Sequence, residues 1–507
     1  MSADRPRFEN KNLDTRCGIA VTNFVLSLMA IEDRIYPLLK HYIGAPQGVK
    51  NLMGAAYSLV PISWRYGSRY AEFMRDIERS DDVEWIRRRA DEKLLETLQW
   101  AAQTVPAYAS MRAEMARDRS PEEHLLAFDL LPKERVKADT AAFLSNSIAP
   151  SERLPMHTGG STSVPMRIYV QKYVSRSKDF AYNGAFDRIA GVRRGDTILA
   201  ARGRPVRGAD KPGGRIWLLD PIKNYLQVSA NHLLPQHMPE YVEAMRKYKP
   251  GFIHAYPTAI EPLARWLEEN PAPDVTGRIR CVQLFSETIH AYQLDLIERV
   301  FKCPVILDYG HSERAVKAIS MPGDRRYFFW PLYGRVELVS FDGKPVTEPG
   351  VLGEIVATGF DNQVMPLIRY RTGDLATWSD RPNHTRPGFP VVDRIEGRLQ
   401  EFLVCKDRRL VSTTSMCAPH FEVLVTADCM QFEQNEPGRA VLKVLSTNEL
   451  SAEAKAVLTD GIRAKTQGGL EVEVVRVDDL PRTAAGKHRL LVQKLDAKNY
   501  TWGAGAT

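Results

Sequence analysis

The sequence predicts an α/β protein with two domains. Residues 1–396 would form a large N-terminal domain, with parallel-rich sheets flanked by helices plus an antiparallel β portion, and residues 397–507 a small, mobile α+β domain. Three observations predict this: residues 1–150 have mostly helical patterns, strands alternate with helices from residue 153, and a short set of strands with one helix follows residue 397. Strands that alternate with helices are typical of parallel sheets covered by helices.

The leading region, residues 1–150, contains the clearest helices. Residues 81–100 repeat apolar side chains at helical spacing, and residues 130–145 have the pattern of a turn followed by a helix. Two apolar runs, 17–31 and 51–64, are shorter than the ~18 residues that a membrane span needs. We expect buried helices there, rather than helices on a membrane surface, and no transmembrane segment.

The central region alternates between apolar runs and amphipathic segments. Strands are expected at 196–202, from 252, at 279–287 and at 304–310, each followed by a helix or a loop. Residues 333–358 instead alternate apolar and polar side chains around the Asp-Gly turn at 341–344, which predicts an antiparallel hairpin. Beyond a boundary near 397–400, further strands surround a helix at 451–466.

The composition excludes several classes of protein. With 44% hydrophobic and 26% charged residues the chain is an ordinary globular protein, neither disordered nor collagen-like. A net charge of +7 is too small and diffuse to indicate nucleic-acid binding, although it suits an anionic ligand such as a nucleotide. The six cysteines form no Cys-x-x-Cys pair, and charged residues fill the start of the sequence. We therefore expect no zinc site, disulfide or signal peptide, and a cytoplasmic location.

A run of glycine and hydroxyl residues at 156–170 is the first candidate site. Such a loop, ending in proline and a strand, leaves many backbone N–H groups free to surround phosphate oxygens. An ordinary linker has the same composition, so the loop alone does not decide. The residues concerned are Thr158, Gly159, Gly160, Ser161 and Thr162.

Three further segments carry residues suited to a nucleotide. Glu313 follows a predicted parallel strand, where ligands bind, and could meet a ligand or its Mg²⁺, although a surface carboxylate is the plainer reading. Asp374, in Thr-Gly-Asp, could accept hydrogen bonds from vicinal sugar hydroxyls, or simply belong to a turn. Lys487, in a basic loop after glycine, could offset charge that develops between a carboxylate and phosphorus, or be solvated.

The succession of these segments is more specific than any one of them. In this order they closely resemble the adenylate-forming superfamily of acyl-CoA synthetases, adenylation domains and luciferases, over residues 132–491. The stretches VPAYASM, LLPKERVKAD, HAYPTAIEPLARWLEE and VMPLIRYRTGD resemble the phenylacetate-CoA ligase branch, and there the CapK-like members of capsular-polysaccharide biosynthesis.

The resemblance implies a role for each candidate residue. The loop of residues 158–162 would close over the ATP phosphates, Ser286 and Glu287 would lie at adenine beside Tyr309 and Gly310, and Glu313 would assist Mg²⁺. Asp374 would bind the ribose, and Arg398 would contact ribose or phosphate. Gln400 would be the hinge of a mobile lid whose Lys487 contacts the carboxylate and the α-phosphate. The acyl pocket would be walled by His254, Ala255, Tyr256 and His311, although core packing explains either histidine equally simply.

The resemblance also implies a reaction. A carboxylic acid would be activated by ATP and Mg²⁺ as an acyl-adenylate with release of pyrophosphate, and then transferred to a thiol, with CoA as the candidate second substrate. Two alternatives remain: transfer to an amine or a sugar, and a non-catalytic nucleotide-binding homologue. The phosphate loop departs from the family because Ser163 and Val164 replace its usual Gly-Lys before proline, which predicts weaker ATP binding. The sequence names neither the acid nor the acceptor, and it leaves the oligomeric state open, a dimer being one option.

Overall fold

The computed structural model describes most of the 507-residue chain. The described residues are 41–42, 45–157, 166–193, 195–202, 206, 214–229, 232–233, 235–398, 402–412, 429–446, 448–466, 468–480, 489–495 and 501–502. The predicted phosphate loop from Thr158 to Thr162, the predicted hinge Gln400 and the predicted catalytic Lys487 lie outside these residues, as does the apolar run 17–31. For Arg398 only the backbone is described.

Helices dominate the leading region, as its pattern predicted. The longest, α7 (Val83–Thr104), confirms the amphipathic helix. It begins where the Asp82 carboxylate accepts a hydrogen bond from the Trp85 N–H at 3.0 Å, and it buries Ile86, Leu94 and Leu98 completely. The other helices up to residue 138 are α4 (Gln47–Ser58), α5 (Ile62–Tyr66), α6 (Ser68–Glu78), α8 (Pro121–Leu126) and α9 (Lys133–Ala138).

The prediction that residues 51–64 are buried is wrong. Leu52 is 73% exposed, Leu59 is 84% exposed and Trp64 is 54% exposed. An apolar run shows only that its residues favour burial, and it does not show that the rest of the fold offers a surface to cover them. Among the residues that the structure describes, no helix combines the length and the apolar character needed to cross a bilayer.

One sheet of twelve strands organises the centre of the molecule. Its order is β11-β12-β13-β14-β10-β9-β8-β7-β6-β3-β5-β4. The run β5-β3-β6-β7-β8 is parallel, and the remaining neighbours are antiparallel. The strands are β3 (Ile198–Ala201), β4 (Trp217–Asp220), β5 (Tyr225–Val228), β6 (Phe252–Ala255), β7 (Cys281–Phe285), β8 (Val305–Gly310), β9 (Lys317–Met321), β10 (Asp324–Phe329), β11 (Gly334–Val339), β12 (Leu352–Gly359), β13 (Tyr370–Trp378) and β14 (Val391–Arg398). The α/β class is confirmed, and the antiparallel portion continues the parallel sheet rather than standing apart.

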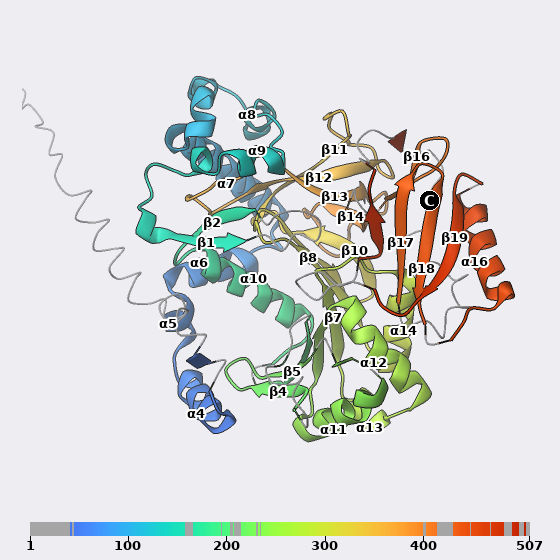
Figure 1. The fold of residues 1–507 in the computed structure, drawn as a ribbon. Helices are drawn as coiled ribbons and strands as arrows, with labels where there is room; N and C mark the ends of the chain where they lie inside the picture. Colours follow the sequence, from blue (N-terminus) through green and yellow to red (C-terminus); the bar gives the residue numbers. More distant parts are fainter. Residues whose placement is uncertain are drawn as a thin grey trace, which may run out of the picture.

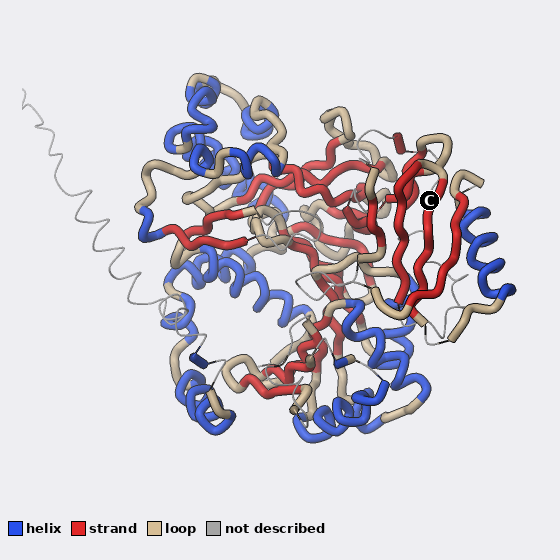
Figure 2. The backbone as a smooth tube through the Cα atoms, viewed as in Figure 1, coloured by secondary structure: helices blue, strands red, loops and turns tan. Residues whose placement is uncertain are grey.

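The two faces of the parallel strands pack against different helices. Leu199, Ile253 and Val282 lie in the core with α11 (Met238–Tyr248), α12 (Pro257–Glu269) and α14 (Ala291–Phe301), near the short α13 (Pro273–Thr276). Ile198 and Phe252 point the other way and pack against α10 (Ser175–Ile189). Figure 1 shows α10 on one side of these strands and α11–α14 on the other, and in Figure 2 the strands form the inner layer. Side chains alternate between the faces because a strand repeats every two residues.

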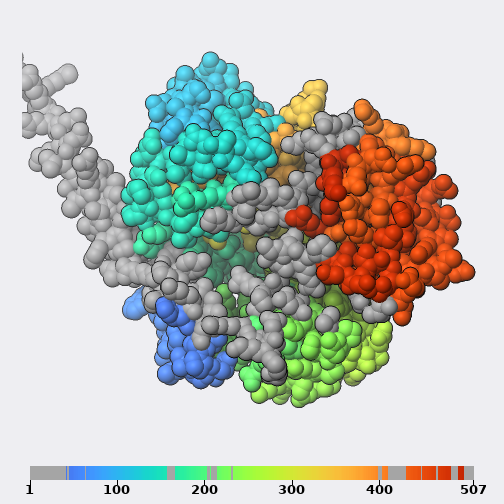
Figure 3. Space-filling model, viewed as in Figure 1, coloured from blue at the N-terminus to red at the C-terminus, as the bar shows by residue number. Residues whose placement is uncertain are grey.

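The C-terminal residues form separate small sheets. A four-stranded sheet has the order β19-β18-β17-β20 and carries α16 (Ala452–Lys465), the helix expected at 451–466. Its core contains Phe432, Leu442 and Leu458, and Figure 3 shows this part at one side of the molecule. The strands are β15 (Phe402–Val404), β16 (Arg409–Ser412), β17 (Cys429–Glu436), β18 (Arg439–Leu445), β19 (Glu471–Val477), β20 (Leu491–Gln493) and β21 (Thr501–Trp502). The domain boundary near 397 stays a prediction.

A two-stranded hairpin and short 3-10 turns complete the described elements. β1 (Arg153–His157) pairs with β2 (Arg167–Gln171), so the chain on either side of the predicted phosphate loop is antiparallel. The turns are η2 (Pro106–Arg112), η3 (Glu114–Ala116), η4 (Ala141–Phe143), η5 (Pro150–Glu152) and η7 (Pro235–His237).

Candidate active site

The carboxyl ends of β6, β7 and β8 gather most of the described candidate residues. These strands are parallel neighbours, so the segments that follow them leave the sheet at one edge, which is where α/β folds bind ligands. Ser286, directly after β7, has a φ of 65°, in the left-handed region that few residues other than glycine adopt. The Glu287 carboxylate accepts hydrogen bonds from the backbone N–H and the hydroxyl of Thr258, at 3.1 Å and 2.8 Å. This carboxylate therefore ties the segment after β7 to the first turn of α12.

The Thr-Gly-Asp motif is a bulge inside β13 rather than a turn between strands. Between the pairs Val356–Arg371 and Glu354–Leu375, β13 uses two more residues than β12, and Gly373 there has a φ of 79°. Bulges re-aim side chains and are frequent beside active sites. Here the bulge presents Asp374, whose Oδ2 accepts a hydrogen bond of 2.8 Å from the Tyr309 hydroxyl on β8.

Glu354 holds this bulge in place from the neighbouring strand. Its Oε1 accepts the Gly373 N–H at 3.1 Å, and its Oε2 accepts from the Arg371 guanidinium. Thr372 donates from its hydroxyl to the Ile355 carbonyl at 2.8 Å and accepts the Asp374 N–H at 3.1 Å. The bulge, and with it Asp374, is thus held in place by hydrogen bonds to backbone atoms and to the buried Glu354 carboxylate.

Glu313 lies beside this pair, in the segment that follows β8. Its Oε1 accepts a hydrogen bond of 2.8 Å from the Tyr370 hydroxyl, and its Oε2 is 3.2 Å from His311 Nδ1. Burial by itself raises the pKa of Glu313, but the His311 ring and the Tyr370 hydroxyl outweigh burial and lower that pKa to about 2. Glu313 is therefore a buried carboxylate that stays ionised at neutral pH.

The structure separates the four residues predicted to wall an acyl pocket. His254 and Tyr256 both contact Phe285, with ring centroids 6.4 Å and 5.2 Å apart. Ala255, in contrast, is fully buried in the core under α11, α12 and α14, so its side chain is on the other face of the sheet. His311 lies with Glu313 and not with His254. The role of all four in acyl binding stays a prediction.

His254 is a buried, neutral histidine. Arg202, directly after β3, donates from Nη2 to His254 Nδ1 at 3.0 Å, and Asp187 on α10 lies 3.6 Å from His254 Nε2. Burial first, and then the positive charge of Arg202, lower the pKa of His254 to about 3, with a small opposing effect from Gln283. Because Nδ1 accepts a hydrogen bond, the proton of the neutral ring is on Nε2.

Those predicted nucleotide-binding residues that the structure describes lie close together. Tyr309 and Asp374 are hydrogen-bonded, and Glu313 is four residues beyond Tyr309. The backbone of Arg398 on β14 pairs with that of Asp374 on β13. Gly310 ends β8 and is exposed. The described residues contain no group of three or more His, Cys, Asp or Glu side chains that could hold a metal ion alone. Any Mg²⁺ at Glu313 would depend on substrate phosphates for its other ligands.

Arg202, Tyr370 and Lys317 belong to these surroundings but were not identified from the sequence. Tyr370 stands four residues before Asp374 in the same motif, so its position was a usable signal. Arg202 is the last residue of the predicted strand 196–202, so its position at the carboxyl end was a signal too. Lys317 joins them only through the register of β9 against β8, which pairs it with Gly310.

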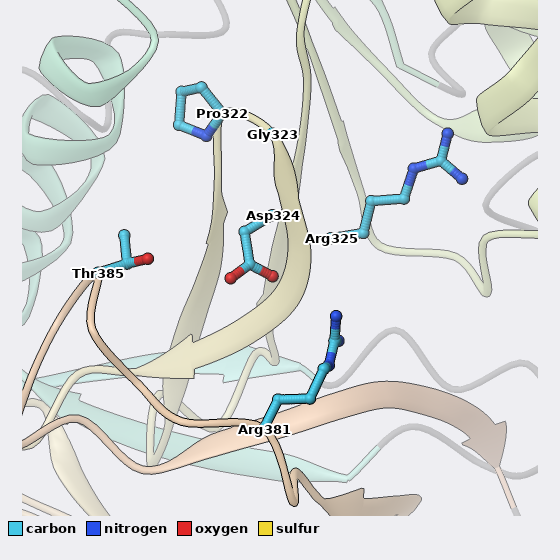
Figure 4. Close-up of a pocket in the computed structure, with 6 residues that line it drawn as sticks. All are labelled: Pro322, Gly323, Asp324, Arg325, Arg381 and Thr385. Atoms are coloured by element: carbon cyan, nitrogen blue, oxygen red, sulfur yellow. The ribbon is translucent and has the colours of Figure 1, made fainter.

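A surface hollow lies elsewhere. It has a volume of about 650 Å³ and is lined by Asp324, Arg325 and Arg381, with Pro322, Gly323 and Thr385. Figure 4 shows Arg325 pointing away from the Asp324 carboxylate. Arg325 instead pairs with Asp295 and Glu298, Arg381 pairs with Asp393, and Asp324 pairs with Arg326. Since β9 runs antiparallel to β8, this hollow lies near the amino end of β8, opposite the Asp374 site.

The molecule has the fold of the adenylate-forming ligases. It superposes on 2-hydroxyisobutyryl-CoA ligase in the postadenylation state, in complex with R3-HIB-AMP, with a TM-score of 0.60 at 16% identity, covering 81% of this chain and 90% of that one. An acyl acid amido synthetase in complex with 2,4-DB gives a TM-score of 0.54 at 12% identity, covering 84% of this chain and 95% of that one. These identities establish the fold alone.

In sequence, the chain is similar to protein CapK of Staphylococcus aureus. The two are 25% identical over 348 residues, which is 68% of this chain and 74% of CapK. No protein-family model matches the chain. The fold predicted from the order of the motifs is confirmed, and the similarity to CapK supports the CapK-like placement.

Proposed function

We propose that this chain is an ATP-dependent, AMP-forming carboxylate ligase that makes an acyl-adenylate, releases pyrophosphate and passes the acyl group to a thiol, with CoA as the first choice. The observation that carries the proposal is the hydrogen bond between Tyr309 and Asp374, with Glu313 beside it, at the carboxyl edge of parallel strands. These residues come from two segments about 60 positions apart, and a shared adenosine site is a simple reason for their meeting.

The described residues suit three parts of this task. Asp374, aimed by the bulge and oriented by Tyr309, can accept hydrogen bonds from vicinal ribose hydroxyls. Ser286 and Glu287, in the segment after β7, line the same edge and would lie at the base. Glu313 stays ionised and can take one position on Mg²⁺, which would offset charge on the phosphates.

Lys487 is proposed to act in the adenylation step. A carboxylate is a poor nucleophile toward an anionic phosphate because both carry negative charge. A lysine ammonium between the carboxylate and the α-phosphate would stabilise the transition state, in which pyrophosphate leaves as the acyl–phosphate bond forms. Glycines and hydroxyls from Thr158 to Thr162 would hold the departing phosphates, and Gln400 would be the hinge of the C-terminal lid.

A pyrophosphate-release screen over carboxylic acids, with hydroxylamine as trapping nucleophile, tests the proposal. Release that requires an acid supports it, and release from no acid, or without any acid, overturns it in favour of a non-catalytic homologue. We expect Lys487→Ala to lose adenylation while ATP binding largely survives. Asp374→Asn should raise the KM for ATP with less effect on the acid, because it weakens only the ribose contact. Full pyrophosphate release by Lys487→Ala would contradict the role of Lys487.

The acyl acceptor needs a separate test. A similar fold is found in an acyl acid amido synthetase as well as in an acyl-CoA ligase, which keeps transfer to an amine as the second candidate. AMP release that depends on CoA favours the thiol, and AMP release that depends on amines or amino sugars in the absence of CoA favours the second candidate.

A further inference from the structure

A group of polar side chains lies between α10 and the sheet, separate from the Asp374 site. On the sheet face that α10 covers, the apolar Ile198, Phe252 and Cys281 occupy the amino ends of their strands. Toward the carboxyl ends the same face changes to polar side chains. We call these the Arg202 cluster: Asp187 on α10, Arg202 after β3, His254 on β6, Gln283 on β7, Asp308 on β8 and Lys317 on β9.

Several polar groups of the Arg202 cluster are hydrogen-bonded to other described residues. Gln283 Nε2 donates to Asp308 Oδ2 at 3.0 Å, and Lys317 Nζ donates to Asn183 Oδ1 at 2.8 Å. Lys317 Nζ also lies 3.9 Å from Asp308 Oδ1, so these two opposite charges nearly balance. These groups are fixed in place by α10 and two strands.

The cluster also contains buried polar atoms without partners. Three buried atoms make no hydrogen bond: Arg202 Nε, His254 Nε2 and Gln283 Oε1. His254 is only 8% exposed and Gln283 only 6%. A buried donor or acceptor without a partner costs free energy, so native structures contain few. The His254 and Gln283 side chains still interact weakly with each other, whereas Arg202 Nε has no partner, so a further acceptor would complete the cluster at Arg202.

Among the described residues, no carboxylate contacts the Arg202 guanidinium directly. Its guanidinium lies between the rings of Tyr225 and Phe285, at 4.9 Å and 5.1 Å from their centroids. Its described contacts are with neutral groups, the Tyr225 hydroxyl at 3.3 Å and His254 Nδ1 at 3.0 Å. Within the described part of the chain, no Asp or Glu oxygen is within 4.0 Å of it. Asp187 is more than a third exposed and lies 3.6 Å from His254 Nε2 rather than against the guanidinium; burial raises its pKa to about 6, which leaves it mostly ionised at neutral pH.

We propose that the Arg202 cluster binds the far end of the acid substrate, and that this substrate is a dicarboxylic acid whose second carboxylate pairs with Arg202. The inference rests on the proposed ligase function. A guanidinium is always charged and presents a planar fork of donors. Arg202 Nη2 already donates to Tyr225 and His254, but Nε makes no hydrogen bond and can donate to a carboxylate.

The position of Arg202 also limits the length of the acid that could reach it. Arg202 follows β3, and Glu313 follows β8, which is three strands away in the order β3-β6-β7-β8. At a spacing of about 4.8 Å between strands, that is roughly 14 Å between the two segments. Phe285 and Tyr256 lie on and after the intervening strands, with rings 5.2 Å apart. The span of roughly 14 Å joins two backbone segments, so it is an upper limit for the distance between the two carboxylates.

Matched acids test the inference directly. Terephthalate and 4-methylbenzoate differ only in the second carboxylate, as do suberate and octanoate among flexible acids. With the wild-type protein we expect kcat/KM for pyrophosphate release to favour the diacid of each pair by about 10- to 100-fold. Arg202→Gln should lose most of this preference through a higher KM for the diacid, while the monoacid of the pair changes little. Arg202→Lys, which keeps the charge but loses the fork, should be intermediate.

Arg280→Gln is the matched control. Arg280 also stacks on a ring, at 4.5 Å from Phe252, but at the amino edge of the sheet, where it pairs with Asp196 at 2.5 Å. It should leave the ratio of diacid to monoacid unchanged. Release with monoacids but no preference for diacids, or a preference that survives in Arg202→Gln, would overturn the inference while leaving the ligase function intact. Release with neither kind of acid would instead contradict the proposed function.

Discussion

Two clusters of buried charge lie at α10, and they differ in whether their cations are paired with a carboxylate. In the first, Lys178 on α10 and Lys93 on α7 both bind Asp361, which follows β12: the contacts are 3.0 Å and 2.8 Å. Lys178 also donates to the carbonyls of Tyr333 and Phe360, at 2.7 Å and 2.8 Å, so all three of its donors have acceptors. In the Arg202 cluster, by contrast, no described Asp or Glu oxygen lies within 4.0 Å of the guanidinium, which contacts only neutral groups.

The difference distinguishes a structural role from a binding role. The Asp361 cluster joins elements that are distant in sequence, here α7, α10 and the segment after β12, and both of its lysines are paired with a carboxylate. A cluster whose cation lacks a carboxylate partner costs stability and regains it only when a ligand supplies that partner. Substitutions should therefore destabilise the first cluster and should affect the second mainly through substrate preference.

The largest effect is expected from Asp361→Asn. Asp361 has a φ of 67°, which asparagine tolerates, so the substitution removes the charge and leaves two buried lysines facing each other. Breaking a buried pair in this way costs about 3 to 5 kcal/mol. Thermal or denaturant unfolding should show a large loss of stability, and the ratio of diacid to monoacid activity should be unchanged in whatever protein remains folded.

Asp342→Asn is the control for that substitution. Asp342 pairs with Lys344 at 2.9 Å, but both side chains are more than half exposed. An exposed pair contributes little to stability, so the unfolding midpoint should stay close to that of the wild type. Equal effects of the two substitutions would show that the Asp361 cluster does not hold the fold together.

Glu313 combines features of both clusters. Its carboxylate is paired with His311 and Tyr370, and a ligand is also expected to contact it. Its pKa of about 2 in the folded protein is below its ordinary value of 4.5. The unfolded chain thus binds the proton first, and Glu313 contributes stability above pH 4.5 that is lost as the pH falls toward 2. The contribution is roughly 3 kcal/mol. Glu313→Gln should unfold with a shallower pH dependence across this window, and an unchanged acid profile would contradict the assigned pairing.

The sequence predicted the parts of this comparison that depend on local pattern. The strands expected from 252, at 279–287 and at 304–310 followed from short apolar runs between amphipathic helices, and α7 followed from its apolar spacing. Glu313 was identified because it follows a predicted strand, and Asp374 because it stands in Thr-Gly-Asp. The bulge that aims Asp374 was read as a turn, because a Gly-Asp pair signals positive φ without saying whether the strand continues beyond it.

The rest depended on pairing between distant residues. Asp361 meets Lys93 and Lys178 across 268 and 183 positions, and no local pattern marks any of them. Arg202 was taken as the end of a strand, and its lack of a carboxylate partner emerges only once β5, β6 and β7 are placed beside it. The exposure of Leu52 and Leu59 was missed for the same reason, since burial depends on what packs opposite.

The smallest effect is expected from His254→Phe, and its sign depends on the pH. The substitution removes the unpartnered Nε2–H and keeps a ring against Tyr225 and Phe285, but it also removes the Nδ1 that accepts from Arg202, so at neutral pH the free energy of unfolding should change by less than about 1 kcal/mol. Because the pKa of His254 in the fold is about 3, against 6.5 ordinarily, the unfolded chain binds a proton first as the pH falls below 6.5. The wild type loses stability there and the variant does not, so its advantage should grow toward pH 5. The same variant should bind diacids more weakly, because Arg202 loses the Nδ1 that holds its guanidinium in place. A His254→Phe protein that is less stable at every pH would place His254 with the structural cluster of Asp361 instead.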